Sequence, residues 1–249
     1  MNHSNHEIKG VGFILRIIKA READVVVRIL TSTGEKISAF AKAGLKSRKR
    51  FGGSLQPLIH IDFRATKKPS QELYFLEETK IRNEFQNLKN QIERLASASY
   101  VAELTDQSSP EGLENLELYN LFGATMKALE AGLPCEGVLR QYELKLLSIM
   151  GWLPAFKICS ECGGRETLTL NSSQGVVMCQ NCGISPISIT EEVQEIMARL
   201  LSSSVSKNNL TIEEAEKVER VTQALLRSHW GEQKLKSVQF LGDLRRFQK

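Results

Sequence analysis

Four cysteines form the motif in this sequence that most directly specifies a chemistry. They form two Cys-x-x-Cys pairs, Cys159 with Cys162 and Cys179 with Cys182, and 16 residues separate the pairs. Two residues between cysteines allow a tight turn that directs both sulfur atoms to one ion, and two such turns provide four thiolates in a tetrahedron. Glycines follow each pair, where a tight turn requires an open backbone conformation. We therefore predict one structural Zn²⁺ per chain, bound by these four cysteines.

Disulfide bonds and redox chemistry are the alternative uses of paired cysteines. The polar N-terminus lacks a basic segment followed by an apolar one, so we expect no secretory signal and a cytoplasmic location, where disulfides are rare. Duplication of the pair at the spacing of a zinc ribbon disfavours a redox Cys-x-x-Cys. A closed four-thiolate site has no open position for a substrate, so its metal stabilises the fold. Cys135 stands alone, and we expect an ordinary thiol there.

A basic segment at residues 42–53 is the second candidate site. No acidic residue lies between Glu35 and Asp62, and glycines at 44, 52 and 53 disfavour a helix interior. We interpret the segment as a flexible loop that follows a phosphate backbone and stacks a base on its aromatic ring. The alternative is a solvated loop that only keeps the protein soluble. The predicted nucleic-acid-binding residues are Lys42, Lys46, Arg48, Lys49, Arg50 and Phe51.

The distribution of charge along the 249 residues supports a polyanionic partner. The net charge is only +4, but residues 1–70 contain 14 Lys/Arg and 5 Asp/Glu, whereas the remainder contains 19 and 24. The N-terminal part therefore carries +9 and the rest −5. A basic front end on a mildly acidic remainder is typical of a module that binds a polyanion, although chance asymmetry on a solvated face gives the same numbers.

Sequence motifs give no reason to expect an enzyme. The chain has no Walker A sequence, no GxGxxG after a strand, no GxSxG and no HExxH. His60 falls on the polar face of an expected strand and His229 near a helix end, without evident catalytic partners. No stretch approaches the roughly 18 uncharged apolar residues of a membrane-spanning helix.

The elements that must position these residues change character near residue 80. Before it, alternating apolar residues predict short strands, which suggest a five-stranded OB-type β-barrel, with a small sandwich as the alternative. The expected strands are Glu7–Lys19, Ala23–Thr33, Glu35–Lys42, Gln56–Thr66 and Gln71–Glu78. After residue 80 the period becomes helical. The expected helices are Arg82–Ser99, Gly112–Ala131, Pro134–Gly151, Thr190–Leu201 and Thr211–Trp230.

Together these patterns predict an α+β protein with two domains. Residues 1–80 form the OB-fold DNA-binding domain, and residues 81–249 form a mainly α-helical domain. A zinc-ribbon-like knuckle is inserted in the helical domain at about 157–187, and segments 167–170 and 175–178 between its cysteine pairs are expected to form a hairpin. Thr211 and Glu214 match a capping box at the start of the last helix.

Three segments resemble the RecO family of bacterial recombination-mediator and DNA-repair proteins, and the resemblance covers nearly the whole chain. The first is Gly10-Val11-Gly12-Phe13-Ile14-Leu15, and the second is Phe51-Gly-Gly-Ser-Leu-Gln-Pro57 after the basic segment. The third and most specific is Tyr142-Glu-Leu-Lys-Leu-Leu-Ser-Ile-Met-Gly-Trp-Leu-Pro154, which leads into the first cysteine pair. The family varies in its cysteines, and this sequence keeps all four.

The resemblance implies an OB-fold, a helical domain with a zinc knuckle, and a nucleoid-associated protein of DNA repair. It implies binding to single- and double-stranded DNA, annealing of complementary strands, contacts with RecR and the single-strand-binding protein SSB, and RecA loading. The residues alone also permit a zinc-ribbon protein-interaction adaptor whose basic loop is incidental. A metal-dependent nuclease is a weaker third interpretation.

Overall fold

The computed structural model describes residues 6–230, 235, 237, 238 and 240–242. The chain divides into two compact units, one with the described residues of 1–126 and 235–249 and the other with those of 127–234. The predicted domain boundary near residue 80 falls inside the fifth strand. The domain assignment, whose ends fall outside the described residues, stays a prediction.

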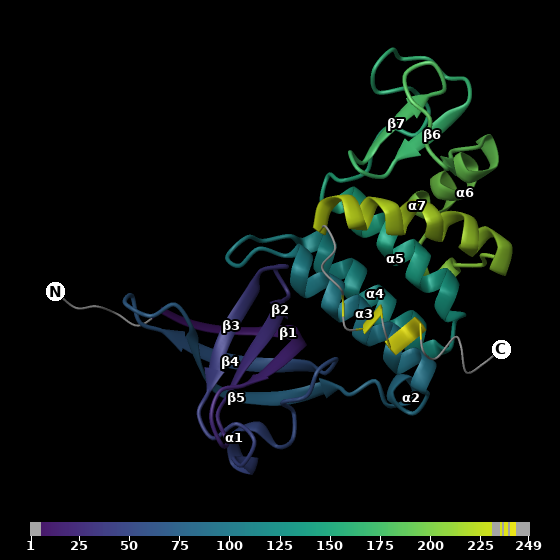
Figure 1. Cartoon of the computed structure of the whole chain (residues 1–249). Helices are drawn as coiled ribbons and strands as arrows, with labels where there is room; N and C mark the ends of the chain where they lie inside the picture. The colour runs from purple at the N-terminus through teal and green to yellow at the C-terminus, as the bar shows by residue number, and fades with distance from the viewer. Residues whose placement is uncertain (1–5, 231–234, 236, 239, 243–249) are drawn as a thin grey trace. The chain divides into compact units, whose positions relative to one another are not determined.

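The N-terminal unit is built on a closed five-stranded barrel with the strand order β1-β2-β3-β5-β4 (Figure 1, purple to blue). All neighbouring strands are antiparallel except β3 and β5, which pair in parallel. The prediction of a five-stranded OB-type barrel is therefore confirmed, and the sandwich alternative is wrong. The strands are β1 (His6–Lys19), β2 (Val25–Thr31), β3 (Lys36–Ala41), β4 (His60–Lys67) and β5 (Tyr74–Asn83).

Strand β1 closes the barrel because it pairs with two partners along its length. Its first half pairs with β4 and its second half with β2, and the pairing register shifts between Ile14 and Arg16. At Gly12 both ladders overlap, and a Cβ atom there would lie 2.6 Å from the Ile29 side chain and 2.7 Å from the Leu30 carbonyl oxygen. Glycine is thus required at this position of the Gly10–Leu15 motif.

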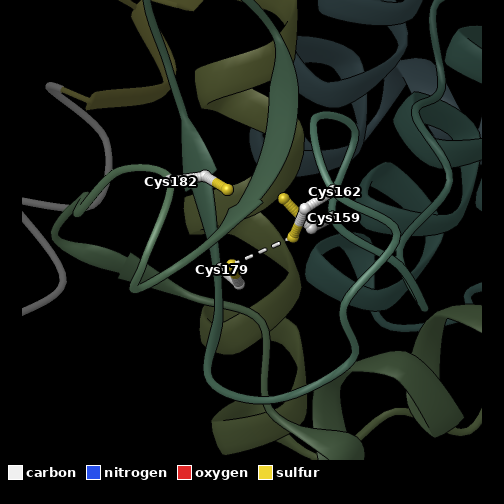
Figure 2. Close-up of side chains that lie close together, drawn as sticks. All are labelled: Cys159, Cys162, Cys179 and Cys182. Carbon is white, nitrogen blue, oxygen red and sulfur yellow. Dashed lines mark hydrogen bonds between the residues drawn. The ribbon is translucent and has the colours of Figure 1, made fainter.

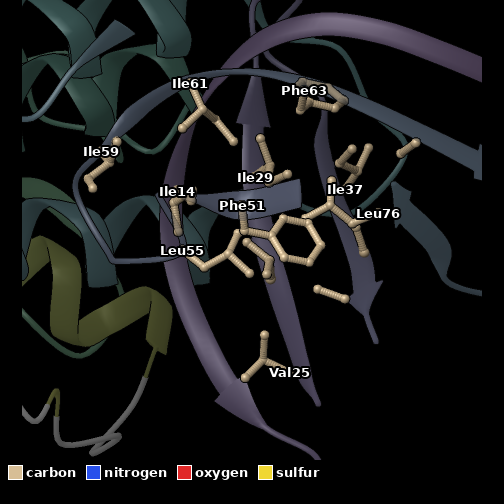
Figure 3. Close-up of a cluster of buried hydrophobic side chains, with 14 residues drawn as sticks. Ile14, Val25, Ile29, Ile37, Phe51, Leu55, Ile59, Ile61, Phe63 and Leu76 are labelled. Carbon is tan, nitrogen blue, oxygen red and sulfur yellow. The ribbon is translucent and has the colours of Figure 1, made fainter. Parts of the chain in front are cut away.

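The barrel interior contains the apolar residues that alternate along the strands. Ile61 and Phe63 of β4 and Ile59 just before it are buried on one side, as their alternation predicts. Figure 3 shows that the Phe51 ring also projects into this core, near Leu55 and other apolar side chains.

Three helices follow the barrel: α2 (Gln86–Lys89), α3 (Ile92–Ser108) and α4 (Leu116–Ala131). The prediction of one helix over Arg82–Ser99 is wrong at its start. Asn83 is the last residue of β5, and Phe85 adopts a left-handed conformation with φ of 52°. Ile92, which lies within the expected helix, is 58% exposed. Helix α3 instead buries small residues such as Ala96, Ala98 and Ala102.

A buried ionic cluster joins α3 to the barrel strands. Asp106 of α3 is 3% exposed and accepts a hydrogen bond of 2.8 Å from Arg28. The Lys36 ammonium lies 3.5 Å from the other carboxylate oxygen and donates to the Asp106 carbonyl at 2.5 Å. Burial lowers the pKa of Lys36. The guanidinium of Arg16 adds a third cation at 3.8 Å.

The second unit is centred on α5 (Cys135–Ile149), which packs against α6 (Glu191–Ser202) and α7 (Ile212–Trp230). A 3-10 turn, η1 (Val205–Lys207), lies between α6 and α7 in sequence. These helices match their predicted ranges closely. The predicted capping box is also confirmed, because Glu214 donates its N–H to Thr211 Oγ1 at 3.2 Å and accepts the Thr211 N–H at 2.9 Å.

The C-terminus of α5 explains the most specific of the family-like segments. Gly151 adopts φ of 70° and donates to the Ser148 carbonyl at 3.0 Å, while Trp152 donates to the Leu147 carbonyl at 2.8 Å. This hydrogen-bond pair is a Schellman motif, which ends the helix and turns the chain. The Gly-Trp-Leu-Pro sequence therefore directs the chain away from α5 toward the first cysteine pair.

Candidate metal centre and nucleic-acid interface

The cysteine pairs lie in and beside a small three-stranded sheet of order β7-β6-β8, and of the four cysteines only Cys179 is a strand residue. Its strands are β6 (Leu168–Asn171), β7 (Val176–Cys179) and β8 (Ile187–Ser188), so the predicted hairpin is present and has an additional strand. Cys179 is the last residue of β7, and the first pair is held beside β7 by a hydrogen bond of 2.8 Å from Ser160 N–H to the Val177 carbonyl.

Two similar backbone turns direct the four sulfur atoms inward. Gly163 donates its N–H to the Cys159 carbonyl at 3.0 Å, and Gly183 donates to the Cys179 carbonyl at 3.0 Å. Gly163 has φ of 72°, which an L-residue rarely adopts, so glycine is needed in the first turn. The predicted role of glycine after the first pair is therefore confirmed.

The four sulfur atoms have the separations that a tetrahedral metal site requires. All lie within 4.8 Å of one another, and Cys162 Sγ and Cys179 Sγ are 3.6 Å apart (Figure 2). Zn–S bonds of about 2.3 Å place the sulfurs of a tetrahedron about 3.8 Å apart. The arrangement fits a four-thiolate metal site, and the convergence of both pairs on one point disfavours two independent redox pairs.

Hydrogen bonds within the cluster shift the pKa values of Cys159 and Cys182 in opposite directions. Hydrogen bonds from the backbone, first from Cys162, lower the pKa of Cys159 to about 6. Hydrogen bonds with neighbouring thiols, first with Cys162, raise the pKa of Cys182 to about 12. Thiolates this close repel one another, and a cation among them offsets that repulsion. Cys135, outside the cluster, is a buried thiol of α5.

The basic segment forms turns and one short helix after the end of β3. Its centre is a single helical turn, α1 (Arg48–Phe51), which the sequence did not predict and which ends at Gly52 in a left-handed conformation. Arg50 donates to Ser47 Oγ at 3.1 Å and also to the Lys42 carbonyl, so the turn is attached to the end of the strand. Lys42, Lys46, Arg48 and Lys49 are exposed, and Arg50 is half-buried.

Phe51 does not have the position that base stacking requires. Its side chain is only 2% exposed and belongs to the barrel core (Figure 3). The stacking role predicted for Phe51 is therefore wrong. The helical turn α1 directs this side chain into the barrel core and leaves the neighbouring cations outside. Arg50 lies over the outer side of the ring, 4.8 Å from its centre.

The remaining five positions of the predicted interface keep their charges available. Among the described residues, none of the five cations forms an ion pair. Four of them are exposed and Arg50 is half-buried, and exposed, unpaired cations are the groups that phosphates attract most effectively. The five cations are Lys42, Lys46, Arg48, Lys49 and Arg50.

A groove of about 590 Å³ extends this basic surface over the strands. Lys49 and Arg50 line it together with Lys9 of β1 and Lys80 of β5. Sequence reasoning missed the last two residues, because alternation places them on the outer face but only the strand register brings them beside α1.

The acidic side chains of the groove are already paired with cations. Asp62 lies 2.8 Å from Arg82, and Glu78 lies 3.1 Å from Arg64. Lys80 has no ion-pair partner in the described part of the chain. The groove therefore keeps a positive surface.

Family models match both parts of the chain. Residues 4–85 match the model for the N-terminal part of Recombination protein O, and residues 89–239 match the model for its C-terminal part. The chain belongs to the RecO family. The family of DNA-repair and recombination proteins inferred from the three sequence segments is thus confirmed.

Similar curated proteins support the same family. The chain is 32% identical over 178 residues to the DNA repair protein RecO of Anaeromyxobacter sp. (strain K), with 70% of each chain covered. It is 30% identical over 247 residues to the RecO protein of Symbiobacterium thermophilum, with 94% of this chain and 96% of the relative covered. The RecO protein of Syntrophus aciditrophicus is 26% identical over 249 residues, with 96% of both covered.

Within the described residues, no helix has the length and apolar composition needed to cross a membrane.

Proposed function

We propose that this RecO-family protein is a recombination mediator without enzymatic activity, which acts on DNA in the cytoplasm. It binds single- and double-stranded DNA, anneals complementary strands and, together with RecR, helps to load RecA onto strands coated with SSB. The observation that carries the proposal is the set of five unpaired cations around α1, continued by Lys9 and Lys80 in the groove. The partners RecR, SSB and RecA come from the resemblance to the family.

Binding in this proposal is electrostatic and tolerant of sequence. Cations that contact phosphates release counterions, and they hold a strand without reading its base edges. Neutralised phosphates repel a second strand less strongly, so complementary strands pair more readily. The acidic-leaning helical part has the opposite net charge and serves as a surface for protein partners.

The proposed metal of the four-cysteine cluster is Zn²⁺, with a structural role. Cys159, Cys162, Cys179 and Cys182 hold it, and the ion keeps the two turns and the β6–β8 sheet together. With four protein ligands the site has no open coordination position, so the zinc takes no part in the handling of DNA.

A specific observation favours the adaptor as a second candidate. Ile184, two residues after the last cysteine, is 87% exposed, and Ile158, next to the first cysteine, is 38% exposed. Exposed apolar side chains beside a zinc knuckle suit a protein-interaction surface. In the adaptor interpretation the basic segment has no role in DNA binding.

Annealing of complementary strands precoated with SSB distinguishes the two candidates. The test variant changes Lys46, Arg48, Lys49 and Arg50 to Ala. A matched control removes the same charge from four exposed cations of the second unit: Lys127, Lys207, Arg220 and Arg227. We expect acceleration by the wild type and the control, and its loss in the test variant.

Two results contradict the proposal. If folded, metal-loaded wild-type protein does not accelerate annealing, the adaptor is favoured. If the control loses as much activity as the test variant, net charge and not the segment around α1 is responsible.

A further inference from the structure

The outer surface of the barrel carries a row of apolar side chains that the function proposed above does not use. In the strand register, Ile18 of β1 pairs with Val26 of β2, Val26 with Phe40 of β3, and Phe40 with Phe75 of β5. The four residues therefore form one continuous row across four strands. Their neighbours along each strand point into the core, so this row faces outward.

The aromatic half of the row is open to solvent. Phe75 is 36% exposed, Phe40 is half-buried, and the ring centres are 6.5 Å apart with a tilt of 47°. Leu73, just before β5, is also 36% exposed. An outward strand face normally carries polar residues, so adjacent exposed aromatic rings indicate a surface that contacts something.

Cations adjoin this aromatic pair at the end of β3. Lys42 lies just after the end of β3, two residues beyond Phe40. Arg50 of α1 donates to the carbonyl oxygen of Lys42. The aromatic pair is thus continuous with the five cations around α1. Lys67 lies over the ring of Tyr74 at 5.0 Å, but Tyr74 packs against the core and is therefore on the opposite face of β5 from Phe75.

Two acidic side chains of the barrel strands are paired with cations. Glu7 forms an ion pair with Lys9 at 3.2 Å, and Glu77 forms one with Arg64 at 3.2 Å. A surface of flat apolar rings bordered by cations complements a chain of flat bases joined by phosphates.

We propose that Phe40 and Phe75 form a base-stacking site for single-stranded nucleic acid, adjoining the basic surface around α1. The inference rests on the proposed DNA binding and assigns to this pair the role that Phe51, in the core, does not have. Aromatic rings stack on any base, so the site adds affinity without sequence preference. It also distinguishes single strands from duplex, because paired bases are not available for stacking on the rings.

An oligonucleotide with abasic sites separates stacking from charge. It keeps every phosphate of a matched single strand and lacks the bases. The test variant is the double change Phe40→Leu and Phe75→Leu, which keeps apolar side chains and removes the rings. Phe240→Leu is the matched control, since Phe240 is 43% exposed and lies outside the row.

We expect the wild type and the control to bind the base-bearing strand about tenfold more tightly than the abasic strand. The double variant binds both strands equally, at the wild-type affinity for the abasic strand and with an unchanged salt dependence. Equal binding of the two strands by the wild type overturns the stacking site and leaves DNA binding intact. Absence of binding to either strand overturns the proposed function and the stacking site together.

A retained preference for bases in the folded double variant also overturns the proposal, and it points to a protein partner for this row. A second variant keeps the test valid if the double variant is unstable. In Phe75→Trp the new indole should be quenched by the base-bearing strand and not by the abasic strand. The native Trp152 and Trp230 pack against each other in the other unit, with ring centres 5.7 Å apart, and provide the background signal of the wild type.

Discussion

The cysteine cluster and the basic segment are the two sites predicted from the sequence, and they differ in how closely the structure follows the prediction. All four predicted cysteines meet at one point. The six predicted residues of the basic segment separate, with five cations outside the barrel and Phe51 inside it.

The difference reflects the kind of constraint that each motif contains. A Cys-x-x-Cys pair specifies a turn, and two pairs at ribbon spacing specify where four sulfurs converge. A run of basic residues specifies only a charge, because the direction of each side chain depends on the turn that forms and on the core beneath it. The spacing of the cysteines therefore predicts the geometry of a site, whereas a run of basic residues predicts only that the partner is negatively charged.

Loss of a metal ligand tests the first half of this comparison and has the largest expected effect. Cys159→Ser combined with Cys179→Ser should reduce bound zinc from about one ion per chain to near zero. The segment at 157–187 should lose its protection from hydrogen exchange, since metal binding to such a site contributes about 10–16 kcal/mol in zinc-finger peptides. Metal content by mass spectrometry and exchange rates measure both effects.

Cys135→Ser is the matched control for the cysteine variant, because this thiol is buried outside the cluster. It should keep its zinc. A fully folded, exchange-protected knuckle in the metal-free double variant would contradict a structural role for the metal.

Removal of charges around α1 should weaken DNA binding in proportion to the number of charges removed, whereas loss of a metal ligand should abolish metal binding altogether. Neutralising the five cations should reduce the slope of single-strand affinity against salt by roughly 3 to 4, at about 0.7 per phosphate contact. Each single variant should account for about 0.7 of that slope. Phe51→Leu should leave the slope unchanged because the ring is in the core. Titrations at several salt concentrations measure these slopes, and an unchanged slope in the five-fold variant excludes this segment as the main contact.

Removal of a buried charge should lower the free energy of unfolding much more than removal of an exposed one. Asp106→Asn leaves three cations around a neutral side chain, and we expect a loss of about 3–5 kcal/mol in the free energy of unfolding. Asp62→Asn removes an acid that is 42% exposed and pairs with Arg82, and it should cost less than about 1 kcal/mol. Denaturant titrations compare the two, and equal costs would show that burial is not the deciding factor.

The capping box of α7 offers a smaller effect than the loss of Asp106, and this effect depends on pH. Thr211→Ala should cost about 1 kcal/mol at neutral pH. Hydrogen bonding, first from the Thr211 backbone, lowers the pKa of Glu214 below 4.5. Its carboxylate therefore contributes stability above that pH, and the contribution disappears as the pH falls through the lowered pKa. Glu214→Gln should be less stable than wild type at pH 7, and denaturation at pH 3 should show a smaller difference.

Local patterns predicted most of the fold because the strands and the later helices follow regular periods. The helix expected from Arg82 failed because β5 continues to Asn83 and Phe85 turns the chain, and neither feature disturbs the apolar spacing. The partners of Asp106 come from β1, β2 and β3, so only the assembled barrel brings them together. Lys9 and Lys80 join the basic groove for the same reason.

The pairing of β1 with both β2 and β4 affects the order in which parts of the chain can fold. The first residue of β1, His6, pairs with Lys67, so the barrel closes only after a loop of about sixty residues has been ordered. The closest sulfur contact of the knuckle joins residues only 17 apart in sequence. Shorter loops close at a smaller entropic cost. During synthesis, the first half of β1 therefore stays without its partner until β4 has been made, whereas the segment with the two cysteine pairs is complete within a much shorter stretch of chain.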